Sequence, residues 1–148
     1  MKKLLILSFI FVQFYAIAQP VVHNSIGFEH TPYIYRICTE LDINTDIYII
    51  PTSKDLAGYT VKNGFGGYII FANLQQTQEP LKLFLAHELQ HISDDINGIW
   101  NLDNPTTKIK KYGNRFVSKE AAELEKRVIS LSNILYKNHK TDKLTSKK

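Results

Sequence analysis

One segment near the middle of the chain constrains the fold most strongly, because it predicts a helix that carries a group of chemistry-bearing side chains. Pro80 suits the first turn of a helix, and Asn97-Gly98 is a typical helix end. The apolar residues between these limits recur at helical spacing and form one stripe: Leu81, Phe84, Leu85, Leu89 and Ile92. We therefore expect a helix that packs on the core by this stripe and carries the pentapeptide His87-Glu88-Leu89-Gln90-His91.

The two histidines of this pentapeptide suit a metal site. Residues four apart on a helix project from the same face, so His87 and His91 can present two imidazole nitrogens to one zinc ion at about 2.0 to 2.1 Å. Glu88 then lies close to the metal without binding it. From there it can take a proton from a water molecule that the zinc activates, and later give it to the leaving amine of a cut peptide. His87 and His91 are thus the predicted metal ligands, and Glu88 is the predicted catalytic base.

The pentapeptide reads HExxH, and in this it resembles the zincin metallopeptidases. A surface helix carries the same letters by coincidence in about one chain in a hundred of this composition. A catalytic zinc site needs three protein ligands and an open position for water, so two histidines are not sufficient. Metzincins extend the motif with a glycine and a third histidine, where this chain has Asp94 and Asn97. The chain instead resembles gluzincins, in which a glutamate on a later helix completes the site.

The resemblance to gluzincins directs attention to a later predicted helix with several glutamates. Glu120 is the expected third ligand, because it lies in the first turn beside small residues that let the helix approach the metal. Glu123, one turn further on, is the alternative, whereas Glu125 is expected to face away. The same acidic group also suits a helix N-terminus without any ligand, since the helix dipole favours carboxylates there. Four other residues remain as weaker candidates for the third ligand: Asp94, Asp95, Asp103 and His139.

Many gluzincins use an aspartate to orient one of the zinc-binding histidines, and this chain lacks it at the usual place. The aspartate follows the ligand glutamate by four residues, where this chain has Leu124 or Arg127. Asp94 or Asp95 is the expected substitute.

Two features of the substrate site are also implied by the resemblance to zincins. The strand before the active-site helix commonly borders the cleft and pairs with an extended substrate, which points to residues 67–71. A tyrosine, histidine or arginine across the cleft often stabilises the oxyanion, and Tyr112 is the candidate for that role here.

The N-terminus has the three parts of a secretory signal peptide. Lys2 and Lys3 precede an apolar run, and the small residues of Ala16-Ile17-Ala18 predict cleavage after Ala18. A run of about 14 apolar residues is short for a membrane span of about 20. The mature chain is therefore expected to be secreted or periplasmic, without stable insertion in a membrane.

The mature chain predicts one α+β domain from residue 19 to residue 136. Helical spacing and runs of β-branched and aromatic residues predict a helix at 31–41, strands at 46–51, 57–62 and 68–71, the helix at 80–96, and a last helix at 118–136. A glycine-rich turn at 63–67 joins the last two strands as a hairpin. We expect a small zincin-like domain with a short mixed or antiparallel sheet and a C-terminal glutamate-bearing helix, followed by a basic disordered tail at 137–148.

The balance of basic and acidic side chains in the mature chain bears on whether its partner is a nucleic acid. Loss of Lys2 and Lys3 with the signal peptide leaves 16 of the 18 basic side chains against 14 acidic ones, so nucleic-acid binding gains no support. The single cysteine, Cys38, lies on an apolar helical face and is expected in the core. The sequence therefore predicts an exported zinc metallopeptidase that hydrolyses a peptide or protein substrate. The alternative is a secreted zinc-binding or interaction protein that keeps the fold but has no catalysis.

Overall fold

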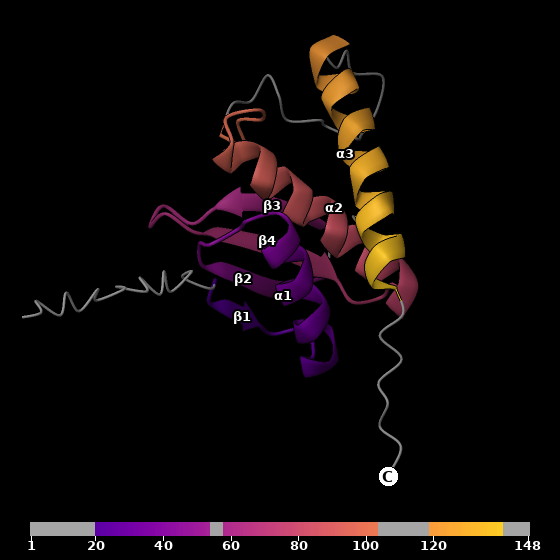
Figure 1. Cartoon of the computed structure of the whole chain (residues 1–148). Helices are drawn as coiled ribbons and strands as arrows, with labels where there is room; N and C mark the ends of the chain where they lie inside the picture. Colours follow the sequence, from indigo (N-terminus) through magenta and orange to yellow (C-terminus); the bar gives the residue numbers. More distant parts are fainter. Residues whose placement is uncertain (1–19, 54–57, 104–118, 141–148) are drawn as a thin grey trace, which may run out of the picture.

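The computed structural model describes residues 20–53, 58–103 and 119–140, and these form an α+β fold (Figure 1). The elements in chain order are β1 (Val22–Asn24), the 3-10 helix η1 (Phe28–His30), α1 (Thr31–Glu40), β2 (Ile47–Thr52), β3 (Gly58–Lys62), β4 (Tyr68–Asn73), α2 (Gln78–Ile96) and α3 (Lys119–His139). The predicted α+β class is confirmed. Every helix and strand that the sequence pattern predicts is present, with ends that differ by at most three residues.

Four strands form one mixed sheet in the order β1-β2-β4-β3. β1, β2 and β4 are parallel to one another, whereas β3 is antiparallel to β4 and lies at the edge. The predicted hairpin turn joins β3 to β4, and Oδ1 of Asn63 accepts hydrogen bonds from the backbone N–H groups of Phe65 and Gly67. The sequence pattern does not predict β1, because a strand of three residues is too short to show alternation and depends on its pairing with β2.

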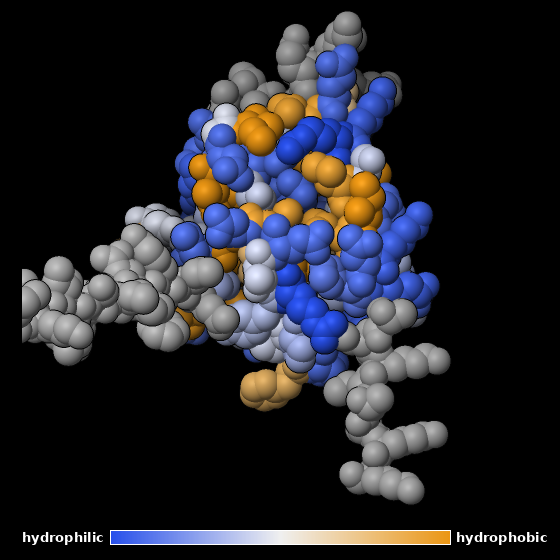
Figure 2. Space-filling model, in the orientation of Figure 1, coloured by the Kyte–Doolittle hydropathy of each residue, from blue (hydrophilic) through white to orange (hydrophobic). Residues whose placement is uncertain are grey.

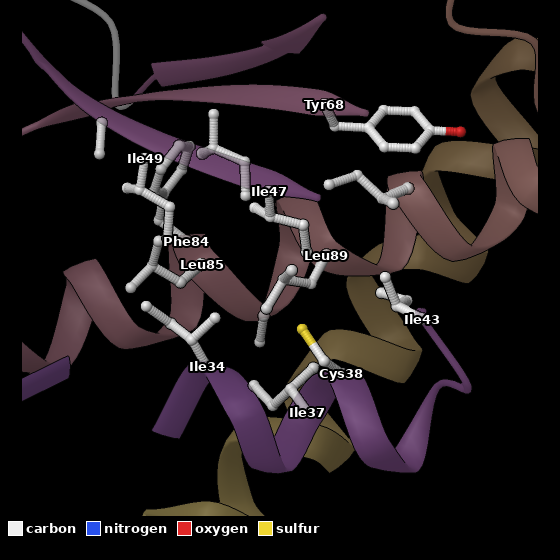
Figure 3. Packing of buried hydrophobic residues seen from close by; sticks show 14 of the residues in the cluster. Ile34, Ile37, Cys38, Ile43, Ile47, Ile49, Tyr68, Phe84, Leu85 and Leu89 are labelled. Atoms are coloured by element: carbon white, nitrogen blue, oxygen red, sulfur yellow. The ribbon is translucent and has the colours of Figure 1, made fainter. Parts of the chain in front are cut away.

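The helices α1 and α2 pack on one face of this sheet (Figure 1), and their apolar side chains meet those of β2 in the core (Figure 3). The predicted stripe of α2 is buried along its whole length. Cys38 of α1 has no exposed surface, and burial raises the pKa of its thiol to about 12. The prediction of a core cysteine is therefore confirmed.

The helix α3 lies across α2 (Figure 1) and continues to His139. This is three residues beyond the predicted end, so the first part of the predicted disordered tail is helical. Two contacts lie at this end of the helix: Nε2 of His139 lies within hydrogen-bond distance of Glu40, and Lys140, the next residue, pairs with Glu79 at 3.3 Å.

On the face drawn in Figure 2, hydrophilic side chains cover much of the helices, and apolar ones show in smaller groups between them. None of the helices in the described part of the chain is long and apolar enough to cross a membrane. The predicted signal peptide and the remainder of the predicted tail, residues 141–148, lie outside the described residues.

A buried carboxylate ties the end of α2 to the hairpin of β3 and β4. The side chain of Asp95 is 4% exposed and accepts hydrogen bonds from the hydroxyl of Tyr68 at 2.6 Å and from the backbone N–H of Leu102 at 3.0 Å. Lys62 pairs with Asp95 at 3.0 Å and also with Asp103. Burial by itself would raise the pKa of Asp95, but the three hydrogen bonds and the charge of Lys62 outweigh it and lower the pKa. The fold therefore favours the ionised carboxylate.

We expect Asp95→Asn to lower the free energy of unfolding by about 2 to 3 kcal/mol at pH 7, because it replaces the charged partner of three donors. A native pKa below the unfolded value of 3.8 adds stability above about pH 4, and this stability is lost as the pH falls through the native pKa. The difference between variant and wild type should therefore shrink below pH 4. Urea unfolding followed by circular dichroism, with EDTA present at each pH, measures this difference.

Asp103→Asn is the matched control for this change. It removes the other carboxylate that pairs with Lys62, but the side chain of Asp103 is 63% exposed, so the cost should be below about 1 kcal/mol. If Asp95→Asn cost the same at pH 7 and at pH 3, the charge of Asp95 would not be the source of its contribution.

Candidate metal centre

His87 and His91 lie one turn apart on α2, on the side that faces α3. Their Nε2 atoms are 3.1 Å apart, and their rings meet at 84°. The side chain of His87 is 22% exposed and that of His91 is 10% exposed, so the pair lies at a partly open surface. Both nitrogens point to one place, as expected for residues four apart on a helix.

Glu125 of α3 supplies a carboxylate at the same place. Its Oε1 is 3.2 Å from Nε2 of His87, and its Oε2 is 3.4 Å from Nε2 of His91. The side chain of Glu125 is 26% exposed, similar to that of His87. Two helices that are separated by a long connection therefore bring three potential ligands together, and this group could hold a metal ion.

The two histidine nitrogens are about as far apart as two ligand atoms of a tetrahedral zinc ion. Atoms bound at about 2.0 to 2.1 Å are about 3.3 Å from one another in a tetrahedron. The two nitrogens are 3.1 Å apart, and each has a different oxygen of Glu125 nearby: Oε1 at 3.2 Å from His87 and Oε2 at 3.4 Å from His91. Two imidazoles and one carboxylate are also a set of ligands found in catalytic zinc sites, where the fourth position holds water. The residues present thus fit zinc in their chemistry, and the two nitrogens also fit it in their separation.

The electrostatics of the group keep Glu125 in the form that binds cations. Burial would raise the pKa of its carboxyl, but hydrogen bonds from His87 and His91, together with their charges, lower the pKa to about 2. The carboxylate is therefore ionised at neutral pH, as a metal ligand must be.

The structure brings Glu125 to the histidines, and the prediction that this residue faces away from them was wrong. Glu123, the predicted alternative, is exposed and does not belong to the group. The side chain of Glu120, the expected third ligand, lies outside the described residues, so its role stays a prediction. Among the side chains that the structure describes, Glu125 is the carboxylate that completes the set.

The error has a physical cause in the orientation of α3. The buried side chains of this helix, Val128, Ser132 and Leu135, recur at intervals of three and four residues. Glu125 lies three residues before Val128 and so continues the same face. The small residues of the first turn suggest a close approach near Glu120, but the buried stripe decides which side of the helix faces its neighbours. This stripe, extended by one turn toward the N-terminus, is the sequence signal that finds Glu125.

An ion pair between the helices fixes α3 close to the metal group. Arg127 of α3 donates a hydrogen bond from Nη1 to Oδ2 of Asp94, whose side chain is 1% exposed. Gln90 donates to the other oxygen of Asp94 at 2.9 Å. Arg127 follows Glu125 by two residues, so this partly buried pair helps to set the position of α3 on α2 in the region from which Glu125 reaches the histidines. Removal of Arg127 would leave the buried charge of Asp94 without its ion-pair partner.

The weaker candidates for the third ligand all pair with residues outside the metal group: Asp94, Asp95, Asp103 and His139. The expectation that Asp94 or Asp95 orients a metal-binding histidine was wrong for His91. Its Nδ1 is buried without a hydrogen-bond partner among the described residues. Both carboxylates instead anchor α2 to its neighbours.

Trp100 packs beside the metal group. Its ring centroid is 4.9 Å from that of His91, and the residue is 4% exposed. The chain turns back after α2, because the backbone N–H groups of Ile99 and Trp100 both donate to the carbonyl of Asp94. The tryptophan is therefore a core residue that also packs against a candidate ligand.

Glu88, the predicted base, contacts β3. Its Oε2 accepts a hydrogen bond from Oγ1 of Thr60 at 2.7 Å, and the residue is 7% exposed. Successive positions on a helix are turned by about 100°, so the base and the two histidines occupy neighbouring sides of α2. The candidate site therefore lies along α2, with α3 on one side and the edge strand on the other.

The sequence predicts that residues 67–71 pair with a substrate, and the structure contradicts this prediction. β4, which contains residues 68–71, pairs with β2 on one side and with β3 on the other, so both of its edges are occupied. Within the described sheet, β3 is the edge strand next to the base. The earlier expectation fails because β4 pairs in parallel with β2 and thereby leaves β3 outermost. Tyr112, the candidate for oxyanion stabilisation, lies outside the described residues.

Comparison of the chain with protein-family models, with curated proteins and with solved structures finds no match. The geometry of the site and the chemistry of its residues are therefore what indicate a function for this chain.

Proposed function

We propose that this chain is an exported zinc-dependent metallopeptidase with a gluzincin-like site, in which His87, His91 and Glu125 hold the ion. The observation that carries the proposal is the convergence of two imidazole nitrogens and one carboxylate group from two separate helices, with contacts of 3.1 to 3.4 Å between them. A coincidental HExxH pattern would place two histidines on one helix face, but it would not bring a third ligand from another helix. The geometry therefore favours a metal site over coincidence.

The residues around the site suit the hydrolysis of a peptide bond. A zinc ion bound here would polarise a water molecule and lower its pKa toward neutrality. Glu88 would take the proton of that water and give it to the leaving amine. Its burial at 7% exposure limits competition from bulk water for the carboxylate, while His87 and Glu125 are partly exposed and therefore accessible from solvent.

The edge strand β3 favours an extended peptide as the substrate. It pairs with β4 on one side, and no strand of the described sheet pairs with its other side. An extended chain could add to this edge by backbone hydrogen bonds, which is a common mode of peptide recognition. Thr60 links β3 directly to Glu88, so a peptide on this edge would lie close to the base. Export completes the proposal, because the N-terminal sequence has the pattern of a secretory signal peptide.

Metal content and turnover together test the proposal. We expect wild-type protein, purified without chelators, to hold about one zinc ion per chain, and His91→Ala to hold far less because one of three ligands is lost. Wild type should cut members of a broad peptide library, lose this activity in EDTA and regain it when zinc is added. Zinc without turnover would instead support the non-catalytic zinc-binding protein. Absence of zinc from wild type would overturn both proposals.

A further inference from the structure

The hydrogen bond between Thr60 and Glu88 joins the edge strand β3, which we propose to bind the peptide, to the proposed general base. Thr60 is the central residue of β3, and its backbone partner on β4 is Ile70. Its hydroxyl donates to Oε2 of Glu88 at 2.7 Å, a usual distance for a well-formed O–H···O hydrogen bond. The bond connects an edge strand to the middle of α2, far away along the chain.

The position of Thr60 is fixed from both ends of β3, because alternate residues of the strand contact α2. At the first, Gly58, an added Cβ would lie 2.4 Å from the ring of Phe84, so the strand packs as closely as a glycine allows. At the last, Lys62 pairs with Asp95 at 3.0 Å. Thr60 lies between these contacts and on the same face of the sheet. The hydroxyl is thus held where the carboxylate of Glu88 needs it.

The bond has a direct consequence for a carboxylate that acts as a base. The carboxylate has two oxygens, and rotation about the last side-chain bond exchanges them unless one is held. Thr60 holds Oε2 and leaves Oε1 to accept a proton. A catalytic group held by a neighbour in this way is already oriented before the substrate arrives.

We propose that Thr60 is a positioning residue that orients Glu88 for proton transfer, and that it does so from the strand on which the peptide substrate lies. This inference rests on the proposed peptidase function. Thr60 itself does not touch the reacting atoms in this scheme. Its contribution is to the rate of the chemical step, and a peptide that pairs with β3 would hold the same strand, and hence the same hydroxyl, in place.

Two variants separate the hydroxyl of Thr60 from its shape. Thr60→Val keeps the branched shape but loses the donor, and we expect kcat to fall about 10- to 100-fold while KM and zinc content stay within about twofold of wild type. Thr60→Ser restores the donor and should recover most of kcat. Thr39→Val is the matched control, since Thr39 is exposed on α1 and donates only within its own helix. Its kcat should equal that of wild type.

A crystallographic measurement tests the same inference without any turnover. In wild type and Thr60→Ser, the carboxylate of Glu88 should occupy one orientation, whereas in Thr60→Val it should be rotated or divided between orientations. A single unchanged orientation in Thr60→Val, or a kcat within twofold of wild type, would overturn the inference, as would an equal loss of kcat in Thr60→Ser. If wild type binds zinc but cuts no peptide, the proposed function fails by itself, and the orientation of Glu88 still decides whether Thr60 positions it.

Discussion

Replacement of Glu88 by glutamine is expected to lower kcat by about 100- to 10,000-fold, the range for loss of a general base, and to leave zinc content near that of wild type. Glutamine has nearly the same shape, and its amide oxygen can still accept the hydrogen bond from Thr60. It cannot take a proton from water at neutral pH. Turnover of the best peptide from the library, measured beside zinc content by atomic emission, gives both quantities on the same samples.

The control for this change is a carboxylate on the same helix that has no role in the site. Glu79 lies in the first turn of α2 with its side chain 66% exposed, so Glu79→Gln should leave kcat and zinc content unchanged. Loss of zinc from Glu88→Gln would show that Glu88 serves the metal site itself and not proton transfer. Turnover of Glu88→Gln at more than half of the wild-type rate would exclude Glu88 as the base.

The features that the sequence predicts correctly are those with a local signal. The helix α2 follows from an apolar stripe whose members all prove to be buried, and the meeting of His87 with His91 follows from helical geometry alone. The hairpin of β3 and β4 follows from its turn, where glycines allow the tight backbone conformation and the side chain of Asn63 accepts hydrogen bonds from backbone N–H groups. Each of these needs only residues that are close together in the chain.

The features that the sequence does not predict depend on contacts between distant segments. The edge position of β3 results from the parallel pairing of β2 with β4, which neither strand reveals in its own pattern. The approach of Glu125 to the histidines depends on how α3 crosses α2, and this is set in part by the pair of Arg127 with Asp94. The sequence alone therefore does not show which glutamate of α3 faces the histidines, because this depends on how α3 packs on α2.

Replacement of Glu125 by alanine is expected to weaken zinc binding by more than about 100-fold. Changes to residues that merely support a metal ligand already cost 10- to 100-fold, and here one of three ligands and its negative charge are removed. The two histidines that remain would hold zinc only weakly at neutral pH. Competition against a chromophoric chelator at pH 7.5 measures the affinity. Unfolding of the metal-free proteins should differ by less than about 1 kcal/mol, because the pairs of Glu125 with the histidines are partly exposed.

Two further alanine variants on α3 test whether the loss of zinc affinity is particular to Glu125 among the glutamates of this helix. Glu123→Ala removes an exposed glutamate from the same helix and should leave zinc affinity within about twofold of wild type. Glu120→Ala tests the ligand that the sequence alone favours. Strong loss of zinc in Glu120→Ala with retention in Glu125→Ala would assign the third position to Glu120 and would mean that α3 turns on its axis when metal binds. Loss of zinc affinity in Glu125→Ala alone would assign the third ligand to Glu125, on the face of α3 that also carries Val128. The packing of α3 on its neighbours, and not the acidic first turn of the helix, would then determine which glutamate binds the metal.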